Sequence, residues 1–98
     1  MTILANLING EWRPSHSDRR QEIHNPATGE VLARVPFATP AEVEAAVTAA
    51  HEAFAEWRQV PPMARARILF RFRELLEEAF EDLACLVTTE NGKIFDEA

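Results

Sequence analysis

Cys85 is the only cysteine in the 98-residue chain and therefore the only thiol that could act as a nucleophile. A reactive thiolate needs a nearby cation or a helix N-terminus, together with access for a substrate. Neither feature is present in the sequence, because apolar residues flank Cys85 inside an expected helix and the acidic Glu81 and Asp82 lie just upstream. We therefore expect Cys85 to be a buried structural residue, and we assign no catalytic residue to this chain.

The other side chains that could do chemistry form no recognisable metal or acid–base cluster. His16, His24 and His51 fall in an expected loop, strand and helix, without metal-ligand spacing. The remaining charges follow helical spacing and are typical of solvated helix faces: Arg65, Arg67, Arg71, Arg73, Glu74, Glu77, Glu78, Glu81 and Asp82.

Residues 90–93 (ENGK) lie at the end of an expected helix and have two interpretations. Unpaired carbonyls at a helix C-terminus carry the negative end of the helix dipole, so the added carboxylate of Glu90 favours a cation there. Alternatively, Gly92 is an ordinary C-cap and Lys93 interacts with the dipole. Spacing alone favours the second interpretation.

Composition and missing motifs exclude several classes of function. The net charge of −6 argues against a nucleic-acid partner, which needs a basic surface. Three glycines cannot form a phosphate-binding loop of the usual kind, so no nicotinamide-cofactor motif is present. No stretch approaches the roughly 18 apolar residues of a membrane span, and no secretory signal is visible. A single cysteine fits a cytoplasmic location.

Strands are expected over about residues 6–36. Asn9-Gly10 between two short apolar runs predicts a hairpin with a type I′ turn. Residues 25–29 (NPATG) predict a second turn, and the alternation over residues 30–35 predicts a further strand.

Helices are expected over about residues 40–58 and 62–91. Thr39 and Glu42 have the spacing of a capping box, with Pro40 at the first helical position. Apolar residues then recur at helical spacing up to Asn91, with a break near residues 80–82, because one helix of that length would be unusual. We expect an antiparallel helical pair as the firm part of the fold and an N-terminal third with few long-range contacts.

Five segments in order and spacing resemble the N-terminal portion of the aldehyde dehydrogenase superfamily: residues 8–12 (INGEW), 25–31 (NPATGEV), the alanine-rich helix 43–57, residues 65–76, and residues 90–93 (ENGK). Residues 61–76 (PPMARARILFRFRELL) look most like the CoA-acylating methylmalonate-semialdehyde dehydrogenases. The resemblance covers nearly the whole chain.

The resemblance implies a large α/β subunit of a homo-oligomer that oxidises a small aldehyde with NAD and passes the acyl group to CoA. The family's nucleophile and cofactor glycines lie beyond Ala98, so we expect residues 1–98 to be the N-terminal part of the domain, truncated before the cofactor and catalytic motifs. It also implies a monovalent-cation site formed by Ile23, His24 and Glu90.

Two alternatives remain open at this point. The first is another NAD(P)-dependent aldehyde dehydrogenase, such as the succinate-semialdehyde type, which shares most of the five segments. The second is a non-catalytic helical interaction module, because Phe70 lies off the main apolar stripe and Phe95 follows the expected helix end with nothing downstream to cover it.

Overall fold

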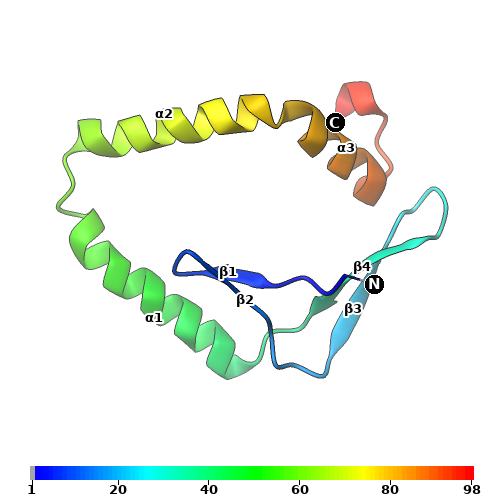
Figure 1. Ribbon diagram of the computed structural model, residues 1–98, viewed down its shortest axis with the longest axis horizontal. Helices are drawn as coiled ribbons and strands as arrows, with labels where there is room; N and C mark the ends of the chain where they lie inside the picture. Colours follow the sequence, from blue (N-terminus) through cyan, green and yellow to red (C-terminus); the bar gives the residue numbers. More distant parts are fainter. Residues whose placement is uncertain (1) are drawn as a thin grey trace.

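The computed structural model describes residues 2–98, which form two β-hairpins, three α-helices and a short 3-10 helix. These elements follow an open arc and do not surround a common core (Figure 1). The radius of gyration is 17.2 Å, whereas a compact chain of this length has about 13 Å. The order of strands followed by helices is the one that the sequence predicts.

The first hairpin pairs β1 (Asn6–Ile8) with β2 (Glu11–Arg13) in antiparallel register. Its turn residues both lie in the left-handed region, with φ of 54° at Asn9 and 75° at Gly10. A type I′ turn needs positive φ at both central positions, which asparagine and glycine tolerate. The predicted hairpin is therefore confirmed.

The second hairpin pairs β3 (Arg20–His24) with β4 (Val31–Pro36), and the N-terminus runs along the other edge of β4. The Leu4 amide donates to the Arg34 carbonyl at 3.0 Å, and the Arg34 amide donates to the Thr2 carbonyl at 2.9 Å. The expectation of few long-range contacts in the N-terminal third was wrong, because backbone hydrogen bonds anchor these strands without a large apolar core.

The helical part consists of α1 (Pro40–Trp57), α2 (Pro62–Glu78), α3 (Phe80–Asn91) and the 3-10 helix η1 (Phe95–Glu97). The break between α2 and α3 falls at Ala79, which has φ −92° and ψ 11°. The sequence predicts an interruption close to this point, and the structure confirms it.

Helices α1 and α2 diverge from their short connection and do not pack against each other along their lengths (Figure 1). The expected antiparallel helical pair is therefore wrong as a packed unit. An apolar stripe predicts that some element covers a helix face, but it does not identify that element.

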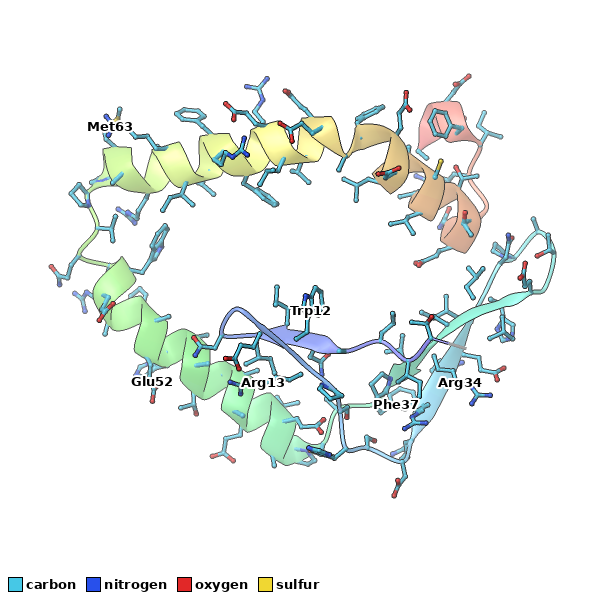
Figure 2. The ribbon with its side chains drawn as sticks, viewed as in Figure 1. Trp12, Arg13, Arg34, Phe37, Glu52 and Met63 are labelled. Atoms are coloured by element: carbon cyan, nitrogen blue, oxygen red, sulfur yellow. The ribbon has the colours of Figure 1, made fainter. Side chains whose placement is uncertain are left out.

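Burial in this structure is sparse. Among residues 2–98, only Ser17, Pro36 and Ala84 are buried. Most large apolar side chains of the three helices are exposed, and side chains line both borders of the arc (Figure 2). The shape of the chain is therefore maintained by local hydrogen bonding far more than by a hydrophobic core.

Candidate functional site

The C-terminal end of α3 lies against the turn between β3 and β4. Gly92 ends α3 in the left-handed region with φ 85°, and its amide donates to the Thr88 carbonyl at 3.0 Å. A Cβ atom at Gly92 would lie 3.2 Å from Cγ of Pro26. Two segments far apart in the sequence thus meet at one point (Figure 1).

The turn on the other side of this contact has a defined backbone. The Asn25 amide donates to the Glu30 carbonyl at 2.8 Å, and the Gly29 amide donates back to the Asn25 carbonyl at 2.7 Å. The Asn25 side chain also accepts a hydrogen bond from the Ala27 amide at 2.9 Å. These bonds fix the position of Pro26 relative to the strands, as an asparagine-initiated turn does.

Ile23 and His24 immediately precede this turn, and Glu90 lies in the last turn of α3. The ladder between β3 and β4 is irregular at Ile23 and His24, where the register shifts. The His24 imidazole lies 3.5 Å from the Glu22 carboxylate, which also pairs with Arg34 at 3.2 Å. The structure therefore brings the two segments that carry these residues together, and backbone and carboxylate oxygens are ligands suited to hard cations.

The described part of the chain holds no cluster of three or more His, Cys, Asp or Glu side chains that could bind a metal ion. Within residues 2–98, no helix is long and apolar enough to cross a membrane.

Cys85 is exposed on α3, so the prediction of a buried residue was wrong. The adjacent Ala84 is the most buried apolar residue of the core, with 3% of its surface accessible. Neighbouring helix positions point about 100° apart, and the side of α3 that carries Ala84 is the covered one. Exposure gives Cys85 access to solvent but supplies no base or cation that would activate it.

A nicotinamide dinucleotide does not fit the residues present. Gly10 and Gly29 lie in hairpin turns and Gly92 caps a helix, so no glycine belongs to a phosphate loop. A hollow of about 660 Å³ lies at the corner between α2 and α3 and is acidic, and its lining residues are Glu77, Glu78, Phe80, Glu81 and Asp82. Carboxylates at that density repel phosphate groups.

Glu42 has a connecting role that the capping-box pattern alone does not reveal. Its carboxylate accepts hydrogen bonds from the Ser15 hydroxyl at 2.7 Å, the His16 amide at 2.7 Å and the Thr39 amide at 3.0 Å. The Ser15 hydroxyl, followed by the two amides, lowers the pKa of Glu42 below its usual value. Glu42 therefore caps α1 and also attaches the loop between β2 and β3 to that helix.

Comparison with known proteins places this arrangement in one family. Residues 12–98 match the model of the aldehyde dehydrogenase family. The chain is 56% identical over 95 residues to malonate-semialdehyde dehydrogenase 2 of Geobacillus thermodenitrificans, a match that covers 97% of this chain and 20% of that protein. The chain thus spans about one fifth of the length of such relatives.

Solved structures show the same open arrangement. The methylmalonate-semialdehyde dehydrogenase of Oceanimonas doudoroffii matches with a TM-score of 0.92 and 43% identity, over 98% of this chain and 20% of that one. A protein of Sinorhizobium meliloti assigned the same activity, and complexed with NAD, matches with a TM-score of 0.94 and 37% identity over 99% of this chain and 20% of that one. The family-model match and these likenesses show that the chain belongs to the aldehyde dehydrogenase family.

Proposed function

We propose that this chain forms the N-terminal part of a CoA-acylating dehydrogenase that oxidises malonate or methylmalonate semialdehyde with NAD, giving acetyl-CoA or propanoyl-CoA. The observation that carries the proposal is the 56% identity to a malonate-semialdehyde dehydrogenase across 97% of the chain. The proposal includes a cytoplasmic, homo-oligomeric enzyme. Within residues 1–98 we assign no group that attacks the aldehyde or binds NAD or CoA.

The chain's contribution to such an enzyme is structural. Its helices present apolar faces, and its hairpins hold the end of α3 against the turn at Pro26. The proposed NAD and CoA sites then belong to the rest of the subunit, because the glycines here lie in turns and a helix cap.

A chimera tests whether the chain can serve as the N-terminal part of such an enzyme. The matching N-terminal fifth of the Geobacillus thermodenitrificans enzyme would be replaced by this chain, and NADH formation would be followed with malonate semialdehyde, NAD and CoA. We expect turnover, because this chain supplies the framework and the rest of the subunit supplies the catalytic groups. A folded but inactive chimera would contradict the proposal.

We also propose that Ile23 and His24, through their backbone carbonyls, and Glu90, through its carboxylate, contribute to a monovalent-cation site. The contact between Gly92 and Pro26 supports the proximity of the two segments, and hard cations prefer such oxygen ligands. In the chimera, potassium or sodium chloride should raise the melting temperature more than choline chloride does. The Glu90→Gln variant should lose this difference, whereas an unchanged difference would remove Glu90 from the site.

A further inference from the structure

The sequence contains two Asn-Gly pairs, Asn9-Gly10 and Asn91-Gly92. This pair can modify itself, because a glycine carries no Cβ and its backbone nitrogen can approach the preceding side-chain amide. The glycine nitrogen forms a bond to Cγ of the asparagine, and the bond from Cγ to the side-chain nitrogen breaks, which releases ammonia. Water then opens the resulting five-membered succinimide ring and leaves aspartate or isoaspartate. The reaction needs water alone and involves no oxidation or reduction.

The structure leaves the first pair open to this reaction. Asn9 and Gly10 are both exposed at the tip of the hairpin of β1 and β2. Within residues 2–98, the Gly10 amide donates no hydrogen bond, and a Cβ added at Gly10 would meet nothing within 4 Å. The hairpin is a sheet of two strands of three residues each. Such a hairpin is marginally stable in water, so its tip can open far enough for the ring to form.

The second pair has the same chemistry in a different setting. Asn91 is the last residue of α3, and the Gly92 amide donates to the Thr88 carbonyl at 3.0 Å. The attacking nitrogen is therefore engaged in the helix cap. Crowding adds to this protection, because the Cγ atom of Pro26 lies 3.2 Å from where a Cβ of Gly92 would be. Ring closure at Asn91 thus requires the end of α3 to unwind first.

We propose that Asn9 is a site of spontaneous deamidation in the folded protein and that the fold protects Asn91 from the same reaction. The reaction is independent of the dehydrogenase activity proposed above, so the two proposals stand or fall separately.

The modification changes the hairpin as well as its charge. Isoaspartate adds a methylene group to the backbone at a position where the type I′ turn needs positive φ. Asn9 also lines a hollow of about 250 Å³ between the hairpin and the alanine side of α1. Conversion at Asn9 therefore places a new carboxylate beside this small-residue face and loosens the hairpin from α1.

Mass spectrometry of peptides that carry residues 9 and 91 tests the proposal. The chimera described above would be incubated at mildly alkaline pH, and the mass gain from amide to carboxyl would be followed at each position. We expect Asn9 to convert at least tenfold faster than Asn91. In guanidinium chloride the two rates should fall within about threefold of each other. Equal rates in the native protein, or an Asn9 that converts only in denaturant, would overturn the proposal.

The Asn9→Gly variant is the matched control. Gly-Gly also supports a type I′ turn but has no side-chain amide to lose. This variant should show no mass gain at the hairpin and should keep its melting temperature during the incubation, whereas that of the wild type falls. An equal fall in both proteins would show that conversion at Asn9 does not loosen the hairpin.

Discussion

Pro26 lies directly beside Gly92, although the two positions are 66 residues apart in the sequence. A Cβ atom added at Gly92 would lie 3.2 Å from the Cγ atom of Pro26. Gly92 is also in the left-handed region, with φ 85°. Glycine is thus favoured here for two independent reasons, one of backbone conformation and one of space. The contact joins the end of α3 to the hairpin of β3 and β4.

Gly92→Ala should therefore destabilise more than Gly29→Ala. Both glycines have positive φ, which costs an L-residue about 1–2 kcal/mol, but a Cβ at Gly29 meets nothing within 4 Å. Differential scanning fluorimetry of the chimera described above should show a lower melting temperature for Gly92→Ala than for Gly29→Ala. Equal shifts would mean that Pro26 moves away freely.

The link between Glu42 and the loop after β2 should depend on pH. Hydrogen bonds from Ser15, His16 and Thr39 lower the pKa of Glu42 from its reference value of 4.5. A carboxyl with a lowered pKa stabilises the folded state above the unfolded value, and this contribution is lost as pH falls through the folded value. The His16 amide signal in NMR spectra should therefore shift with pH below about 4.5.

The Glu42→Gln variant should abolish that titration at His16, whereas Glu44→Gln on the same helix should preserve it. Glu44 is the matched control because it lies on α1 and accepts no hydrogen bond from the loop within the described structure. Persistence of the His16 titration in Glu42→Gln would assign it to another group.

Cys85 should react with a thiol reagent in the native chain at the rate of an exposed cysteine. The structure places it on the uncovered side of α3, so no unfolding is needed for access. Labelling with and without denaturant should give rates within about threefold of each other. If the thiol reacts only after unfolding, Cys85 is buried in solution, as the sequence predicts.

The turns and caps could be predicted from the sequence, because short-range chemistry determines them. Asn9-Gly10 and the pair Thr39 and Glu42 each specify a backbone conformation over a few residues. The exposure of Cys85 and the divergence of α1 from α2 could not be predicted from the sequence. Both depend on which elements of the fold cover each helix face. The hydrogen bond between Ser15 and Glu42 joins positions 27 residues apart. The sequence indicates only the capping role of Glu42, through its spacing from Thr39.

Thermal unfolding of the isolated chain should be broad or accompanied by self-association. Only three of the described residues are buried, so little apolar area is exposed on unfolding and the transition has a small enthalpy. Circular dichroism with light scattering measures both properties. A sharp two-state transition from a monomer would identify the chain as an independent domain.

We expect this chain to supply framework and not catalysis to an aldehyde dehydrogenase, and a paired assay tests this expectation most directly. The isolated chain and the chimera would each be mixed with NAD, CoA and methylmalonate semialdehyde, and NADH absorbance would be followed. We expect no NADH above a blank for the isolated chain and turnover for the chimera. Turnover by the isolated chain that disappears in the Cys85→Ser variant would contradict the account.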